Sequence, residues 1–182
     1  GGAFILDGEA FHLDRNRDGN TLHGGTQGFH RRMWSPRPTT SGVEFTLESE
    51  DGDMGFPGNL RISVHFTLDG DRLQIDYTAS SDKSTVINLT NHAYFNLGGD
   101  GCATIEGHEL LLNADYFTPV GPGLIPTGAI SSVAETPFDF NRMQPIGRRI
   151  NQPSEQLVRA GGYDHNWVLQ EGNQQLREAA VV

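Results

Sequence analysis

The sequence has a single cysteine, Cys102, among its 182 residues. One cysteine excludes an internal disulfide framework and a four-cysteine zinc site, and it fits a reducing compartment such as the cytoplasm. Positive charge is also scarce, because 13 Lys and Arg stand against 23 Asp and Glu and give a formal net charge of -10. A surface of this sign repels phosphate backbones and anionic membranes, so we expect neither a nucleic acid nor a membrane as partner.

Long apolar runs are missing as well. No stretch approaches the roughly 20 apolar residues that a membrane-spanning helix needs. The first residues, from Gly1 to Phe4, lack the basic start and apolar core of a signal peptide. The chain begins without Met, which leaves a removed leader open, and we expect it to be a piece of a longer protein.

Glycine and proline are abundant, with 23 Gly and 9 Pro placed between short apolar runs. That punctuation favours many short strands over long helices. Two hairpins are predicted in residues 4–13 and 60–77, where alternating apolar residues flank Asp-Gly turns. We also expect strands at residues 43–47, 85–89 and 109–112 and from Val168, with a turn at 172–173, short helices at 145–150 and 155–158, and a loop at 36–42. These elements predict an all-β fold, a sandwich or a barrel, and the length predicts a single domain over residues 1–182.

The first segment that could carry chemistry is residues 20–29, which contain His23 followed by Gly24 and Gly25. Two glycines allow positive φ and a close backbone approach, so the loop can aim an imidazole into a cleft. The alternative is a solvated histidine in a turn, which residue types alone favour.

The second segment is residues 88–99, where an apolar run ends in polar residues, aromatic residues and a glycine pair. Imidazole titrates near neutrality, so His92 can act as a general acid or base. Asn91 and Asn96 can fix a histidine tautomer or bind hydroxyls. The alternative, a strand-end histidine satisfied by backbone groups, is about equally supported by the residues.

The third segment is residues 161–167, in which Asp164 and His165 follow a glycine pair. Adjacent residues of an extended chain point to opposite sides, so we expect one of the two to face a site and the other to support the loop. Trp167 offers an apolar face to a sugar ring. Residues 115–120 hold no obvious catalyst, and we interpret them as a packed structural segment.

Motifs of several other enzyme classes are absent. The sequence has no phosphate-binding loop of the Walker type and no Gly-x-Ser-x-Gly nucleophile elbow. His23, His92 and His165 do not sit at the short spacings of metal ligands, so we expect no metal site.

The motifs together resemble the aldose 1-epimerase (galactose mutarotase) family in sequence, order and approximate separation. The string Thr-Asn-His-x-Tyr-Phe-Asn-Leu is highly specific, and the likeness runs over essentially the whole chain. It is carried by residues 4–8, 22–25, 51–60, 90–97, 115–120 and 162–166.

The resemblance implies a large antiparallel β-sandwich, present in part, and an enzyme that interconverts the α and β anomers of free hexoses such as glucose and galactose without a metal or cofactor. Mutarotation needs an acid at the ring oxygen and a base at the anomeric hydroxyl. By resemblance, His92 is the general acid, His23 binds the sugar and assists near the ring oxygen, and Asp164 binds sugar hydroxyls.

Two departures from the family pattern matter. The family's base is a glutamate well after the Gly-Tyr-Asp-His-Asn segment, and neither Glu171 nor Glu178 sits in its context. The family's Asn-Arg pair before the opening residues has no counterpart here. We therefore expect a chain truncated at both ends, whose activity alone is very low.

Two alternative functions are an inactive carbohydrate-binding sandwich and a hexose-6-phosphate epimerase. The second would need a basic pocket for the phosphate, and Arg31–Arg32 and Arg148–Arg149 are the only tight basic pairs in the sequence.

Overall fold

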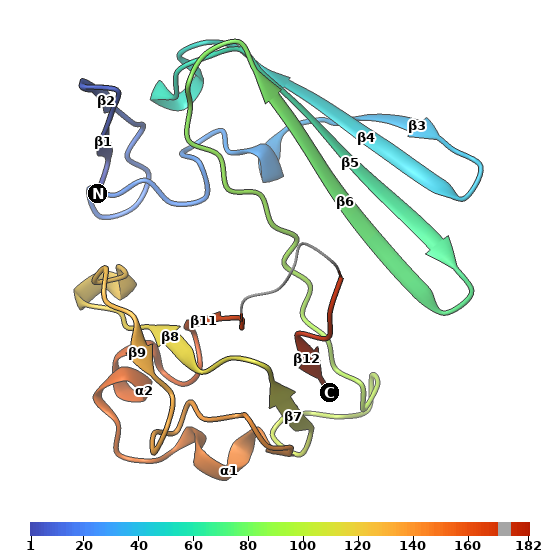
Figure 1. Ribbon diagram of the computed structural model, residues 1–182, viewed down its shortest axis with the longest axis vertical. Coiled ribbons are helices and arrows are strands. Elements are labelled where there is room, and N and C mark those ends of the chain that lie inside the picture. The colour runs from blue at the N-terminus through green and yellow to red at the C-terminus, as the bar shows by residue number, and fades with distance from the viewer. Residues whose placement is uncertain (171–175) are drawn as a thin grey trace. The chain divides into compact units, whose positions relative to one another are not determined.

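The computed structural model describes residues 1–170 and 176–182, and the chain forms two compact units, Gly1–His92 and Ala93–Val182 (Figure 1). Every pairing between named strands in the described residues is antiparallel. No helix in this part of the chain has the length and apolar character needed to cross a membrane. A single domain over residues 1–182 stays a prediction.

The first unit begins with the predicted hairpin of β1 (Ala3–Leu6) and β2 (Glu9–His12). Its two-residue turn has Asp7 at φ 51° and Gly8 at φ 84°. Positive φ at both positions matches the right-handed twist of the strands, and Asp-Gly tolerates it well. The hairpin prediction is confirmed.

A four-stranded sheet forms the rest of this unit, in the order β3-β4-β5-β6 (Figure 1). The strands are β3 (Ser35–Pro38), β4 (Gly42–Ser49), β5 (Leu60–Asp69) and β6 (Arg72–Ser81), with short 3-10 turns η1 (Phe29–Arg31) and η2 (Asp53–Gly55). Alternation along β4 and β5 places Leu47, Ile62 and Val64 on one buried face. The predicted strand at 43–47 and the hairpin in 60–77 are confirmed.

Two predictions in this unit are wrong. Residues 36–38, expected in a loop, belong to β3, which pairs with β4 along the edge of the sheet. Proline lacks an N–H and is tolerated in edge strands, so Pro36 and Pro38 do not exclude a strand there. Residues 85–89, expected as a strand, have no strand partner among the described residues, and an apolar run without a partner gains no ladder hydrogen bonds.

The second unit contains two three-stranded sheets, in the orders β10-β7-β12 and β11-β8-β9. Its strands are β7 (Glu109–Leu112), β8 (Tyr116–Thr118), β9 (Ser131–Ser132), β10 (Gln144–Pro145), β11 (Asn166–Val168) and β12 (Ala180–Val181), and its helical segments are η3 (Pro122–Leu124), α1 (Gly147–Ile150) and α2 (Glu155–Ala160). The strand at 109–112 and both short helices are confirmed. Val168 ends a strand instead of beginning one, and the turn predicted at 172–173 lies outside the described residues.

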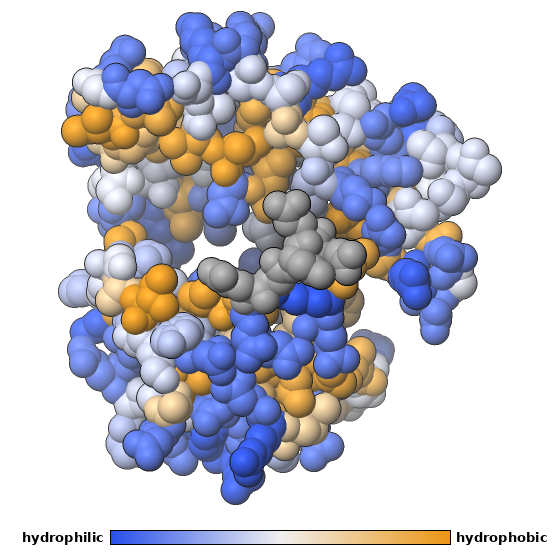
Figure 2. All heavy atoms as spheres, in the orientation of Figure 1, coloured by the Kyte–Doolittle hydropathy of each residue, from blue (hydrophilic) through white to orange (hydrophobic). Residues whose placement is uncertain are grey.

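Aromatic side chains build the core of the second unit. Phe117 of β8 stacks on Phe138 with ring centroids 4.4 Å apart, and both rings are buried. Phe117 and Val120 are buried, which agrees with the packed segment predicted at residues 115–120. Trp167 packs against this core as a partly buried side chain, and its indole N–H donates to the Phe138 carbonyl at 3.0 Å. That its ring presents an apolar face to a sugar stays a prediction. Figure 2 shows hydrophilic side chains over much of the visible surface, interrupted by apolar patches.

Candidate active site

The His23 loop is shaped by close backbone packing. His23 itself has φ 51°, and Gly24 and Gly25 follow at 80° and 94°. A Cβ atom at Gly28 would lie 2.0 Å from the His23 carbonyl oxygen, so only glycine fits there. The His23 side chain is exposed, and its ring meets the edge of His30 with centroids 5.9 Å apart. The predicted glycine-shaped loop thus presents an imidazole to solvent.

Asp14 fixes this loop from twelve residues away. Its Oδ2 accepts hydrogen bonds from the Thr26 backbone N–H at 2.6 Å and from the Thr26 hydroxyl at 2.5 Å. The hydroxyl first, and then the N–H, hold the pKa of Asp14 below its ordinary value, because both donors stabilise the carboxylate. Sequence reasoning missed Asp14, since no local motif connects it to residues 20–29.

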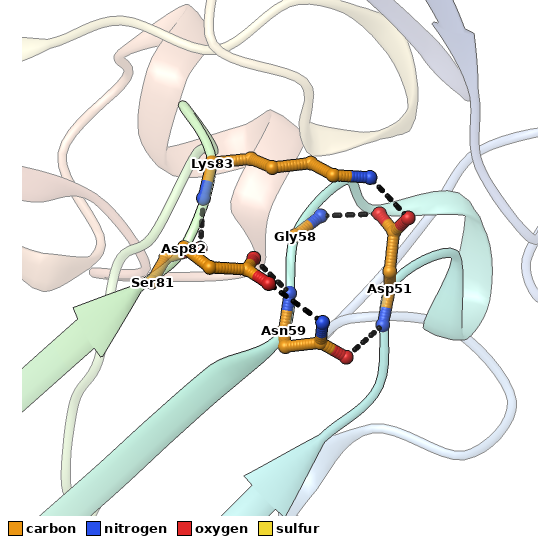
Figure 3. A network of polar contacts seen from close by, with 6 residues as sticks. All are labelled: Asp51, Gly58, Asn59, Ser81, Asp82 and Lys83. Atoms are coloured by element: carbon orange, nitrogen blue, oxygen red, sulfur yellow. Dashed lines mark hydrogen bonds and ion pairs between the residues drawn. The ribbon is translucent and has the colours of Figure 1, made fainter.

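A network of hydrogen bonds and an ion pair lies at the end of β6, before the segment that contains His92 (Figure 3). Asp51 accepts a hydrogen bond from the Gly58 N–H at 2.6 Å and forms an ion pair with Lys83. Asp82 accepts from both the backbone and the side-chain nitrogen of Asn59, at 2.7 Å each. The residues that follow β6 are thereby held to the loop between β4 and β5.

The contacts in this network shift the pKa values of its three charged side chains. The Lys83 ammonium, followed by the Gly58 N–H, lowers the pKa of Asp51, and the Asn59 side chain and backbone lower the pKa of Asp82. The Asp51 carboxylate in turn raises the pKa of Lys83. All three charges are therefore stabilised at neutral pH.

His92 lies in a segment without regular secondary structure, and its side chain is exposed. Asn96, considered above as a partner for a histidine or a hydroxyl, is used within the following turn. Its Nδ2 donates to the Cys102 carbonyl at 2.9 Å, and its Oδ1 accepts from the Gly98 N–H at 3.0 Å. Asn96 therefore shapes the glycine turn.

Asp164 and His165 differ in burial, which agrees with the alternation expected of adjacent residues, while the role of one in a site and of the other in the loop stays a prediction. The Asp164 side chain is exposed and makes no hydrogen bond or ion pair within the described residues. The His165 ring is half-buried, edge-on to Phe138 with centroids 4.6 Å apart. Burial lowers the pKa of His165, although the nearby Asp164 carboxylate acts in the opposite direction.

The structure gives no catalytic contact for Glu178 and no metal-binding cluster in the described residues. Glu178 is exposed just before β12, and its carbonyl accepts a hydrogen bond from the Asn113 side chain at 2.8 Å. Glu171 lies outside the described residues. Within residues 1–170 and 176–182, no three His, Cys, Asp or Glu side chains are grouped so that they could hold a metal ion.

The predicted site residues are divided between the two units. His23 and His92 belong to the first unit and Asp164 to the second, and each is exposed in a loop. Their combination in one site stays a prediction.

Comparison with known proteins assigns the chain to a family. A family model described as aldose 1-epimerase matches residues 1–182. Galactose mutarotase from Bos taurus is 42% identical over 181 residues, which cover 100% of this chain and 51% of the relative. Aldose 1-epimerase from Escherichia coli (strain K12) is 40% identical over 169 residues, covering 92% of this chain and 48% of the relative.

Solved structures agree with this assignment. The crystal structure of galactose 1-epimerase from Lactobacillus acidophilus NCFM matches with a TM-score of 0.85 and 34% sequence identity, over 98% of this chain and 53% of that one. This likeness confirms the predicted all-β class, a sandwich of the galactose mutarotase type. The chain spans about half the length of the curated relatives it matches. It belongs to the aldose 1-epimerase family.

Proposed function

We propose that this chain provides the acid and the sugar-binding residues of an enzyme that interconverts the α and β anomers of free hexoses such as glucose and galactose. The observation that carries the proposal is the family match over residues 1–182, which includes all three predicted site loops. Within these loops, an imidazole at position 23 and a carboxylate at position 164 are exposed on backbones held by the surrounding protein.

The proposed chemistry is ring opening by acid and base. His92 donates a proton to the ring oxygen while a base removes the proton of the anomeric hydroxyl, and the bond between C1 and the ring oxygen breaks. Rotation about the bond between C1 and C2 and closure on the other face give the second anomer. His23 binds the sugar near the ring oxygen. The Asp164 carboxylate accepts hydrogen bonds from sugar hydroxyls, which are strong because the acceptor is charged.

The remaining proposals follow from the same assignment. The partner is a small sugar, the reaction uses no cofactor and no metal, and the protein works in the cytoplasm. The family's base is a glutamate, and neither Glu171 nor Glu178 matches its context, so we assign the base to no residue of this chain.

The test is polarimetry of fresh α-D-glucose and α-D-galactose with the full-length gene product that contains these residues. We expect His92→Ala to lower kcat by about 10²–10⁴, the usual contribution of a general acid. His12→Ala, which removes an exposed histidine of β2, is the matched control and leaves the rate unchanged. Near-normal turnover of His92→Ala would remove His92 from the acid role, and sugar binding without turnover by the wild type would favour a carbohydrate-binding protein.

A second candidate, a hexose-6-phosphate epimerase, is favoured by one observation. Arg142, Arg148 and Arg149 line a pocket of about 480 Å³ in the second unit. None of these three arginines forms a salt bridge within the described residues, whereas Arg32 of the other tight basic pair is paired with Asp53. Asp139 also lines the pocket and reduces its positive charge. The same assay with glucose 6-phosphate separates the candidates, and we expect faster turnover of the free sugar.

A further inference from the structure

His165 is half-buried and directly follows the exposed Asp164. Its ring is wedged edge-on against two core aromatic rings, with centroid distances of 4.6 Å to Phe138 and 5.8 Å to Phe117. A side chain packed in this way has little rotational freedom. The ring therefore offers its two nitrogens in fixed directions.

The hydrogen bonds of the ring define its tautomer. The Asp164 backbone N–H donates to His165 Nδ1 at 3.3 Å, so Nδ1 is an acceptor and carries no proton. The second nitrogen, Nε2, lies 3.2 Å from Gln156 Oε1, an oxygen that can only accept. The proton of the neutral ring therefore sits on Nε2 and is donated to Gln156.

Gln156 is itself held on both sides of its amide. Its Oε1 accepts from the Val120 N–H at 2.8 Å, and its Nε2 donates to the Val120 carbonyl at 3.1 Å. Arg159, one turn further along α2, donates to the same carbonyl at 2.5 Å. A chain of hydrogen bonds thus runs from the loop before η3, through α2 and the His165 ring, to the peptide of Asp164.

We propose that His165 is a positioning residue, which orients the Asp164 carboxylate toward sugar hydroxyls by accepting the Asp164 backbone N–H at Nδ1. The inference rests on the proposed function, in which Asp164 binds the sugar. The Asp164 carboxylate is exposed and forms no salt bridge within the described residues, so the hydrogen bond at its backbone N–H is a contact through which the protein places this residue. The ring of His165 touches no reacting atom in this scheme and acts through its neighbour.

The arrangement works with the neutral ring. A proton at Nδ1 would turn the acceptor into a donor that faces the Asp164 N–H, and the hydrogen bond would be lost. Of the charged groups nearby, the adjacent Asp164 carboxylate favours the charged His165 ring, and the Arg159 guanidinium on α2 is hydrogen-bonded to the Val120 carbonyl. The other neighbours of the ring are the uncharged side chains of Phe117 on β8 and Phe138 before α1. Burial prevails and keeps the ring neutral, so the support is lost only as the pH falls below the ordinary histidine value of 6.5.

Two variants of the full-length gene product separate the two nitrogens. His165→Asn places an amide oxygen where Nδ1 lies and keeps the acceptor for Asp164, while His165→Gln places its amide near Nε2 and keeps only the contact to Gln156. Both remove the ring, so a merely structural role lowers Tm alike in both. We expect His165→Gln to raise KM for D-galactose about five- to tenfold, with kcat within about twofold, and His165→Asn to stay within about twofold of wild type in KM.

The pH dependence provides a second readout. Between about pH 7 and pH 5, KM of the wild type should rise more steeply than KM of His165→Asn, because only the wild type loses the acceptor at this position. Equal KM values for the Asn and Gln variants, or identical pH profiles of wild type and His165→Asn, would overturn this inference alone. A wild-type protein without mutarotase activity would overturn the proposed function and the inference with it.

Discussion

At the scale of single residues, backbone conformation determines how the site loops present their side chains. His23 has φ 51°, a left-handed conformation that costs a residue with a Cβ atom roughly 1–2 kcal/mol. The loop must supply that energy, and the hydrogen bonds from Thr26 to Asp14 are one source. The close packing of Gly28 against the His23 carbonyl leaves no room for a Cβ atom there. An exposed histidine in a favourable conformation would need no such support.

Gly28→Ala tests this packing. The added Cβ would lie 2.0 Å from the His23 carbonyl oxygen and 3.0 Å from the His30 ring, so the loop must shift. We expect a loss of about 1–3 kcal/mol in the free energy of unfolding, typical of overpacking, and a higher KM for the sugar. Chemical denaturation and polarimetry measure the two effects. Gly107→Ala is the control, because nothing lies within 4 Å of its Cβ position, and an equal effect of both variants would contradict the prediction.

At the scale of elements, the network of Asp51, Asn59, Asp82 and Lys83 holds the end of β6 to the loop between β4 and β5 (Figure 3). The lowered pKa values of Asp51 and Asp82 connect this network to the pH dependence of stability. A carboxyl group whose pKa is lowered by folding stabilises the protein above its ordinary value of 3.8, and the contribution is lost as the pH falls below that value.

Asn59→Ala removes the side-chain donor to Asp82 and the acceptor for the Asp51 N–H. We expect a lower urea midpoint at neutral pH and a smaller further loss of stability between about pH 4 and pH 2, since the pKa of Asp82 is then less lowered. Urea unfolding across this range measures both. Glu48→Gln breaks only an exposed ion pair with Arg61 at 3.7 Å and should change neither quantity. A slope unchanged by Asn59→Ala would refute the assigned role.

The sequence predicts elements well where the signal is local. Asp7-Gly8 identifies the first hairpin because the turn chemistry lies within the turn itself, and the alternation along residues 60–66 identifies β5 in the same way. The sequence does not predict the strand Ser35–Pro38, because its formation depends on the position of β3 at a sheet edge. The strand expected at residues 85–89 does not form among the described residues, because a strand needs a partner and no local sequence pattern identifies one.

The same distinction holds for the candidate site. His23, His92 and Asp164 are predicted because they lie in motifs with a specific order, and their place in one site stays a prediction. The burial of residues 164 and 165, exposed and half-buried, agrees with the alternation expected of neighbours. Asp14 and Gln156 support these loops from elsewhere in the chain, and their roles are visible only as contacts. Supporting residues are harder to predict than the residues they support, because folding alone brings them together.

At the scale of the whole molecule, each unit has a core of its own. The first is an aliphatic core on the four-stranded sheet around Ile62, and the second is an aromatic core around Phe138. The proposed function draws on residues from both units, since His23 and His92 lie in the first and Asp164 in the second. Destabilising either core should therefore reduce activity, even where no site residue is touched.

The last prediction concerns the 182-residue chain by itself. It carries the proposed acid, His92, but no residue that matches the family's glutamate base, so its mutarotation should be very slow. A small carboxylate in solution can act as the base, and acetate should therefore accelerate the reaction in the presence of the chain beyond its effect in buffer alone. The excess should disappear in His92→Ala, as measured by polarimetry at constant pH and ionic strength. If the chain alone matched the rate of a complete relative, it would have to contain its own base, and Glu171 and Glu178 would be the first residues to replace.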